Sequence, residues 1–316
     1  MAIRRLAAPA PAPTAAARSQ PDTGPAHSEF PGCRPVRISR AEIADYDGRI
    51  EYWDGKTETA FKACEPTTVY HEGPGQRLAA LASRIAAGRG APITTLGTAD
   101  LLVRNARGER QRILQADQIV YVHPVETEPR GAAVEVGTDH LPDVVLEVDF
   151  STDVRRGKLG LYESWGFPEV WVDVPDAESR SRSPRRPAGL TIHHRGPDGF
   201  RTVPASVAFP GWTAAEIHAA LNEPTLSEAT STVLTRVGRA LGDADGTFPD
   251  DDPWLREQRR EATREATLQV VTRILRSRGI DLPEHSLARL ARAAPDDLVD
   301  AALGCRDAAD LIARLR

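Results

Sequence analysis

LPDVVLEVDFST, residues 141–152, decides the fold of this 316-residue chain. Val144–Val148 within it is a continuous apolar run interrupted only by Glu147, which is typical of a buried strand. A helical stretch follows over Val154–Trp165, and a second β-branched run follows over Val170–Val174. Strand, helix and strand in this order indicate part of an α/β core.

The same alternation continues on both sides of this stretch. Asp-Gly between strand-like runs is a strong turn signal, and helical spacing of apolar residues ends where glycine follows. The expected elements are a hairpin over 50–63, a helix over 76–87, strands over 93–103 and 113–122, and a hairpin over 190–207. We therefore expect an α/β fold with a central mixed sheet flanked by helices.

Composition divides the chain into four parts. Residues 1–35 are rich in Ala and Pro, bury little surface and are expected to be disordered. Residues 36–222 form the α/β domain, and residues 223–252 form a helix and an acidic linker. Residues 253–316 have helical periodicity and are expected to form an all-α appendage.

Bulk properties exclude several classes of protein. A formal net charge of −5 argues against coating of nucleic acid by overall positive charge, although local basic patches stay open. Mean hydropathy is −0.38, and no apolar run is long enough for a conventional membrane span. The 3 cysteines are too few and too widely spaced for a disulfide framework, so we expect reduced thiols and a cytoplasmic location.

Acidic side chains mark the candidate site. Asp143, Glu147 and Asp149 alternate along one strand and therefore share a face. Asp117 opens another strand, and Lys158 lies in the helix after the first. Carboxylates that converge at a sheet edge need a cation, and oxygen ligands without thiolates favour Mg²⁺ or Mn²⁺.

A hard cation beside an amine suits cleavage of phosphodiester bonds. The metal polarises the phosphoryl oxygen and lowers the pKa of a bound water, while the ammonium steadies developing negative charge. The chain has only 3 lysines among 40 basic residues, so a lysine at this place is informative.

In this order, these residues resemble the signature of the Uma-type restriction endonuclease family, bacterial proteins of the PD-(D/E)XK nuclease superfamily. The resemblance runs from about Ile38 to Leu221. It is carried by the hairpin with Glu51 and Asp54-Gly55, His71, Asp117, Pro142-Asp143, Glu147-Val148, Ser151-Thr152, Lys158, Tyr162, Trp165-Gly166, Pro168–Asp173 and Phe209–Trp212. It implies a restriction-endonuclease-like core and a metal-dependent endonuclease that acts on DNA.

The resemblance also implies roles for single residues. Asp117 and Glu147 would hold Mg²⁺ or Mn²⁺, and Lys158 would be the catalytic lysine, moved from the strand to the following helix. The superfamily's usual lysine lies two residues after the acid, where this chain has Asp149. Asp149 is thus either a third ligand or a solvent-facing residue.

Asp143 and His71 complete the set of candidate supporting residues. Asp143 also suits the start of a strand and His71 the start of a helix, so each has a structural interpretation beside the functional one.

The main candidates have structural interpretations too. Glu147 could form an ion pair with Arg155 or Arg156 without any catalytic role. Asp117 could serve as a turn or cap residue, and Lys158 could be a solvated helix residue.

Three further expectations concern partners. The basic segment Arg180–Arg186 is either a solvated insertion or a loop that contacts phosphates. An apolar stripe over Ala262–Ile274 suggests a homodimer through the C-terminal helices. The alternative to an endonuclease is a catalytically inactive scaffold that binds nucleic acid or protein and associates through its helical tail.

Overall fold

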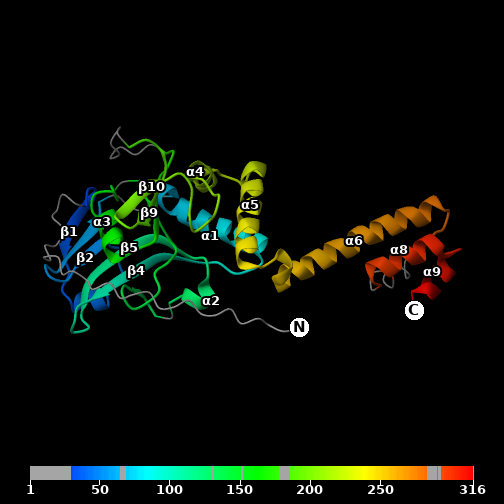
Figure 1. Ribbon diagram of the computed structural model, residues 1–316, viewed down its shortest axis with the longest axis horizontal. Coiled ribbons are helices and arrows are strands. Elements are labelled where there is room, and N and C mark those ends of the chain that lie inside the picture. Colours follow the sequence, from blue (N-terminus) through cyan, green and yellow to red (C-terminus); the bar gives the residue numbers. More distant parts are fainter. Residues whose placement is uncertain are drawn as a thin grey trace.

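The computed structural model describes residues 30–64, 69–129, 131–150, 152–177, 186–282, 290 and 293–315. Those residues form a mixed α/β fold around a mixed sheet, with helices on its faces and further helices toward the C-terminus (Figure 1). The strands are β1 (Cys33–Arg37), β2 (Tyr52–Asp54), β3 (Thr59–Ala63), β4 (Thr94–Arg104), β5 (Arg110–Tyr121), β6 (Val134–Glu135), β7 (Val144–Val148), β8 (Glu169–Val174), β9 (Gly189–Gly196) and β10 (Gly199–Val203). The helices are α1 (Val69–Arg89), α2 (Pro124–Thr127), α3 (Lys158–Trp165), α4 (Ala214–Asn222), α5 (Glu228–Asp245), α6 (Pro253–Ser277), α8 (Pro295–Gly304) and α9 (Ala308–Arg314), with 3-10 turns η2 (Glu42–Ala44) and η3 (Pro249–Asp251).

Strand β5 organises the sheet. The order is β1-β3-β2-β5-β7-β8-β9-β10, and β4 also pairs with β5. Because β4 pairs with β5 along nearly its whole length, β2 and β7 must share the other edge. They meet it at successive places, β2 at Arg112–Leu114 and β7 at Gln118–Val120. The short interval of β5 around Asp117 therefore lies where two strands end.

One face of the sheet is covered by α3. β7 and β8 are parallel neighbours, so the chain must cross over between them, and α3 lies on that crossover. Tyr162 of α3 packs with Ile119, Tyr121 and Val145 of the sheet. The expected helix over Val154–Trp165 is thus confirmed in its second half and begins at Lys158.

The other face is covered by α1, α4 and α5. Leu81 and Ile85 of α1, together with Val237 of α5, pack on the alternate residues of β5 and β7 in the main core. The helix expected within residues 223–252 is α5, and it belongs to this core. The buried residues along α5 explain why, because they form an apolar stripe that packs against α1.

The α/β unit also begins earlier than residue 36. Phe30 is buried against Tyr52, and β1 starts at Cys33. Burial of the Phe30 ring at the edge of the core stabilises the fold. This offsets the conformational entropy that the segment loses when it is ordered. Residues 1–29, the greater part of the expected disordered segment, lie outside the described residues.

The C-terminal helices have a core of their own. Leu268, Val271 and Leu275 of α6 pack with Leu298 and other residues of α8 and α9. This face differs from the apolar stripe that the sequence suggested, because Ala262, Ala266 and Val270 are exposed. The remaining helix expected near 284–293 falls largely outside the described residues.

Two further sequence expectations concern the membrane and the cysteines. Of the helices in the ranges above, not one combines the length and apolar character that a bilayer crossing needs. Cys33, Cys64 and Cys305 are all free thiols.

Candidate active site

Asp117 and Glu147 lie side by side on neighbouring strands. β5 and β7 are antiparallel with Gln118 paired to Leu146, so one further step places Asp117 opposite Glu147. Residues opposite each other on antiparallel strands point to the same face, and here that face lies under α3. The backbone N–H of Val148 donates to Asp117 Oδ2 at 2.7 Å, which fixes the carboxylate at this place.

Lys158 reaches both strands from the first residue of α3. Its Nζ donates to Glu147 Oε2, Glu51 Oε2 and the carbonyl oxygen of Gln115, each at 2.8 Å. The side chain is only 3% exposed. Lys158 is therefore a buried, fully bonded ammonium that joins β7, β5 and the start of β2.

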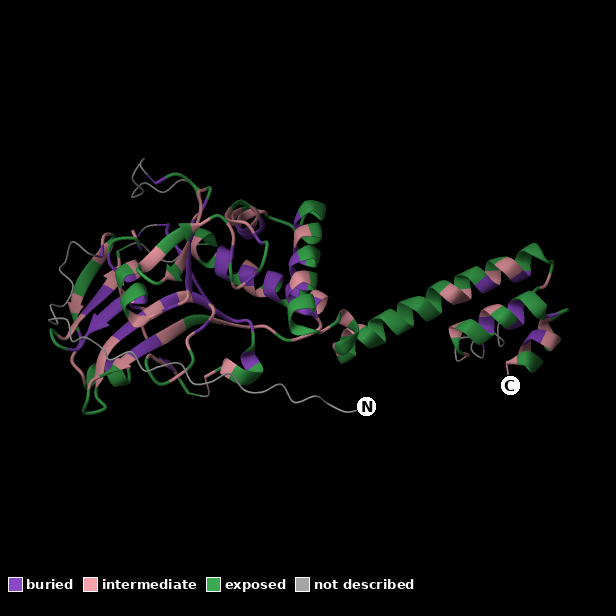
Figure 2. Cartoon of the chain, viewed as in Figure 1, coloured by how far each residue is buried: buried purple, intermediate pink, exposed green. Residues whose placement is uncertain are grey.

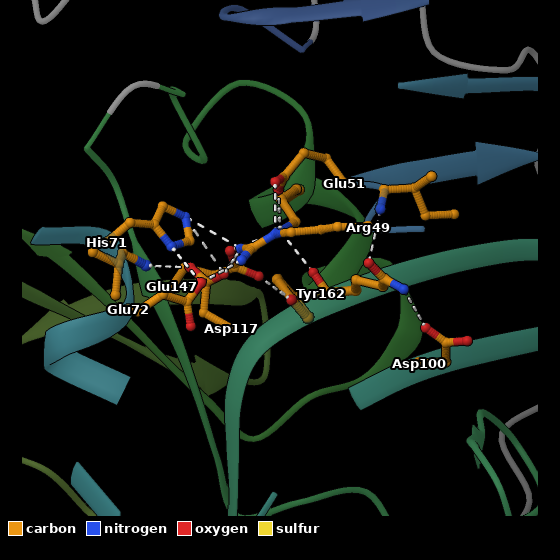
Figure 3. Close-up of polar contacts among 12 residues, drawn as sticks. Arg49, Glu51, His71, Glu72, Asp100, Asp117, Glu147 and Tyr162 are labelled. Atoms are coloured by element: carbon orange, nitrogen blue, oxygen red, sulfur yellow. Dashed lines mark hydrogen bonds and ion pairs between the residues drawn. The ribbon is translucent and has the colours of Figure 1, made fainter. Parts of the chain in front are cut away.

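Tyr162 lies one helical turn after Lys158 and completes the surroundings of Glu147. Its hydroxyl donates a hydrogen bond to Glu147 Oε1, as Figure 3 shows. The spacing of four residues explains this, because side chains four apart on a helix lie on one face. Glu147 is 1% exposed, and its two carboxylate oxygens accept hydrogen bonds from Lys158 and Tyr162 of α3.

Arg49 forms the solvent side of the site. Its guanidinium donates to Asp117 Oδ1, and a second nitrogen contacts Glu72 Oε1 at 2.7 Å. Arg49 Nε lies 3.7 Å from Glu51 Oε1. Because Arg49 is 27% exposed and Glu72 49%, water reaches the carboxylates past these two residues.

His71 stands next to Asp117 in the first turn of α1. Its Nε2 lies 3.7 Å from Asp117 Oδ1 and 3.2 Å from an Arg49 nitrogen. Its Nδ1 is buried without a hydrogen-bond partner within the described part of the chain. The helix begins at Val69, ahead of the 76–87 that periodicity indicates. Pro74 lies inside it, and because proline usually interrupts a helix, the sequence pattern pointed to a later start. This early start carries His71 into the site.

The electrostatics of the site follow from its burial. Burial raises the pKa of Glu147 to about 8; Lys158 opposes this rise, while the Asp117 and Glu51 carboxylates add to it. Burial alone would lower the pKa of Lys158, but Glu147, Glu51 and Asp117 outweigh it and hold that pKa above its ordinary value.

Asp117 behaves in the opposite way. Burial would raise its pKa, but His71, Lys158 and Arg49 together hold it below its usual range. Asp117 is therefore the firmly ionised acid of the pair, and Glu147 holds its proton more tightly.

Two of the expected supporting residues lie elsewhere. Asp143 accepts a hydrogen bond from the Val122 backbone N–H at 2.7 Å and fixes the start of β7. Asp149 is fully buried rather than solvent-facing, and its Oδ1 lies 2.5 Å from Arg186. Glu147, in turn, pairs with Lys158 and not with Arg155 or Arg156 among the ion pairs of the described residues.

Arg186 is the described end of the basic segment Arg180–Arg186. Its guanidinium is buried against Asp149 and also donates to the Asp149 carbonyl oxygen at 2.8 Å. Residues 180–185 lie outside the described residues. Arg186 itself is thus committed to the protein interior and is not available to a phosphate.

The donor set fits a hard divalent ion held by few protein ligands. Across the ranges that the structure describes, no three His, Cys, Asp or Glu side chains are grouped to hold a metal. Mg²⁺ usually takes one or two carboxylates and completes its shell with water and phosphate oxygens. Asp117 and Glu147 supply two, and the Arg49 guanidinium already places a cationic group against Asp117. Two carboxylates are the number that Mg²⁺ commonly takes, and a metal ion here would replace hydrogen bonds that their oxygens now accept from Arg49, Lys158 or Tyr162.

Sequence reasoning gave no role to two charged residues of the site, Arg49 and Glu51. Both precede the short strand β2 at alternate positions, and Tyr52 pairs with Leu114. Because the two strands are antiparallel, continuing this register from Tyr52 toward the N-terminus brings Glu51 and then Arg49 toward Asp117. The signal was the placement of charges at i and i+2 immediately ahead of a hairpin. Tyr162, to which the sequence analysis assigned no chemical role, is buried and bonds to Glu147.

Comparison with known proteins gives only distant structural likenesses. No family model matches the chain, and no curated protein matches it in sequence. A solved structure from Anabaena variabilis, described as "a putative nuclease belonging to DUF820", superimposes with a TM-score of 0.35 at 11% sequence identity. The match covers 63% of this chain and 99% of that one.

Proposed function

We propose that this chain is a metal-dependent endonuclease that hydrolyses phosphodiester bonds of DNA. The observation that supports it is the meeting of Asp117 and Glu147 on facing strands with the Lys158 ammonium 2.8 Å from Glu147. Two acids far apart in sequence converge with a buried amine. Burying these charged groups costs folding free energy, which a purely structural role does not require.

Asp117 and Glu147 would hold Mg²⁺ or Mn²⁺, which supplies Lewis acidity toward a phosphoryl oxygen and a more acidic bound water. The remaining roles, which are to place charge and to orient the carboxylates, belong to side chains of this protein. Lys158 holds its three protons at Nζ and places fixed positive charge beside Glu147. Tyr162 donates its hydroxyl proton to Glu147 Oε1 and fixes the direction of that carboxylate.

His71 and Arg49 face the solvent side, where a phosphate would approach. The His71 ring lies between two carboxylates, with Nδ1 3.5 Å from Glu72 Oε1 and Nε2 3.7 Å from Asp117 Oδ1. Arg49 offers a planar fork of donors that matches two oxygens of a phosphate. In the structure that fork is held by Asp117 and Glu72, so it must turn outward when substrate binds.

The test is a plasmid-nicking assay with Mg²⁺, Mn²⁺ or a chelator. Asp117→Asn and Glu147→Gln keep the shape of each side chain and remove its charge, and both are expected to abolish nicking. Asp198→Asn, at an exposed turn, is the matched control and should cut as the wild type does. Equal nicking by the wild type and the two site variants would overturn the proposal.

An inactive scaffold is the second candidate, and one observation favours it. Glu147 and Lys158 are almost fully buried, and Arg49 occupies Asp117. Calorimetric titration with Mn²⁺ separates the two candidates. Heat of binding that disappears in Asp117→Asn supports the nuclease, whereas no binding to the wild type supports the scaffold.

A further inference from the structure

Two adjoining hollows away from the candidate active site are lined by arginines from three helices. One, of about 660 Å³, lies along α6, and the other, of about 300 Å³, lies between α1, α5 and the start of α6. Arg259 lines both, so the two hollows adjoin at this side chain. We call this surface the arginine track; its arginines are Arg84, Arg239, Arg256, Arg259, Arg260 and Arg264.

The track concentrates positive charge in an acidic protein. Among the described residues that line the two hollows, Asp250 is the one carboxylate, and it lies 2.5 Å from Arg259. Arg260 lies 3.9 Å from Glu257, whereas Arg256 and Arg264 have no ion pair with any described carboxylate. The whole chain has a net charge of −5, so this segregation is not a reflection of overall composition.

The sequence of α6 produces the segregation. Arg256, Arg260 and Arg264 recur every four residues and share one face. The glutamates of the same turns, Glu257 and Glu261, follow by one residue and are therefore turned by about 100° around the helix axis. The arginines thus line the hollow, whereas Glu257 and Glu261 are not among its described lining residues, although Glu257 reaches back to Arg260 at 3.9 Å.

Packing does not explain this part of α6. From Arg256 to Ala266 every residue is exposed, and the helix first buries a side chain at Val271 (Figure 2). An exposed helix without a core-facing stripe has no structural need to gather one sign of charge on one face. The gathered charge is better explained by a partner than by folding.

We propose that the arginine track binds the sugar–phosphate backbone of DNA, which names a second contact for the substrate of the proposed nuclease and rests on that function. A row of cations fits an extended polyanion better than a single small anion. The hydroxyl groups of Ser231 and Thr263 also line the hollows and can donate to phosphate oxygens. Contacts of this kind give affinity without base sequence specificity.

Fluorescence anisotropy of a labelled DNA duplex, in chelator so that no cleavage occurs, tests the track. The double variant Arg256→Gln/Arg264→Gln should weaken binding about tenfold and lower the slope of log Kd against log salt by about 1.8, that is, about 0.9 for each phosphate contact. Arg273→Gln/Arg276→Gln removes the same charge from another side of the same helix and should change affinity much less. Circular dichroism checks that α6 stays helical in both.

Three outcomes overturn the inference. Equal weakening by the two double variants would show that only total charge matters. Salt-independent binding by the wild type would exclude phosphate contacts. Tighter binding of poly-glutamate than of the duplex would assign the track to an acidic polypeptide.

The outcome is separable from the proposed activity. Track-dependent binding without nicking in any metal removes the nuclease proposal and keeps the track. Nicking with DNA affinity unchanged in Arg256→Gln/Arg264→Gln removes the track and keeps the nuclease.

Discussion

Arg49 donates a hydrogen bond to Asp117, so the cation nearest to the firmly ionised acid of the site is a guanidinium. A metal ion at Asp117 must compete with that guanidinium for the same oxygen. Arg49 therefore holds the site in a charge-neutralised state in which the three carboxylates Glu51, Asp117 and Glu147 are not left to repel one another.

Replacing Arg49 by Gln should strengthen metal binding. The variant removes the competing charge while keeping a hydrogen-bonding side chain, and we expect Mn²⁺ affinity to rise about tenfold, which is about 1.4 kcal/mol. Calorimetric titration measures it. Arg37→Gln removes the same charge from an exposed side chain that pairs with Glu58 and is the control; a similar gain there would show that overall charge, and not the bond to Asp117, sets the affinity.

Replacing Lys158 by Met should destabilise the fold strongly. The change leaves the buried carboxylates of Glu51 and Glu147 without their cation, and removing one partner of a buried ion pair costs about 3–5 kcal/mol. Urea unfolding measures the loss. Adding Glu51→Gln should restore part of the stability, and a strictly additive double variant would contradict the contact.

Gly238 should not accept a side chain, because α1 and α5 cross there. A Cβ at this place would lie 2.7 Å from the Ile85 carbonyl oxygen and 3.1 Å from Gly88 Cα. Gly238→Ala is expected to lower the free energy of unfolding by about 1–3 kcal/mol. Gly160→Ala in α3 meets no atom within 4 Å and should instead raise it by about 0.5–1 kcal/mol.

His218 should make stability depend on pH. The hydrogen bond to Asp173, at 2.7 Å from His218 Nδ1, raises the histidine pKa against the opposing effect of burial. A raised folded pKa stabilises the fold fully below the unfolded value of about 6.5, and the contribution is lost as pH rises through the folded value.

The measurement for His218 is the free energy of unfolding at about pH 6 and about pH 8.5. The wild type should lose more stability across this interval than His218→Gln does. His140→Gln, at an exposed site, serves as the control. An identical loss in all three proteins would exclude His218 as the source.

The sequence was most informative where one pattern dictates one structure. The run Val144–Val148 is apolar on both faces, so it could only be a central strand, and Glu147 was conspicuous within it. Lys158 was conspicuous because the chain has few lysines. The structure brings these two residues together with Asp117.

Other parts of the site depended on tertiary pairing that no local pattern contains. Arg49 joins the site only because it directly precedes β2, whose first residue, Tyr52, pairs with β5 close to Asp117. Asp149 shares the strand with Glu147 and yet pairs with Arg186, whose position depends on a remote segment. In α6, the face that packs within the chain was set by α8 and includes Leu268, Val271 and Leu275, which the four-residue periodicity of Ala262, Ala266 and Val270 did not indicate.

The facing positions of Asp117 and Glu147 also determine where this chain can change length during evolution. Deleting one residue within β7 would turn every later side chain of that strand to the opposite face and separate the two acids. The connection between the strands, which contains α2 and β6, can grow or shrink without moving either acid. Insertions in divergent copies of this chain are therefore expected to collect in that connection and to be absent from the strands that it joins.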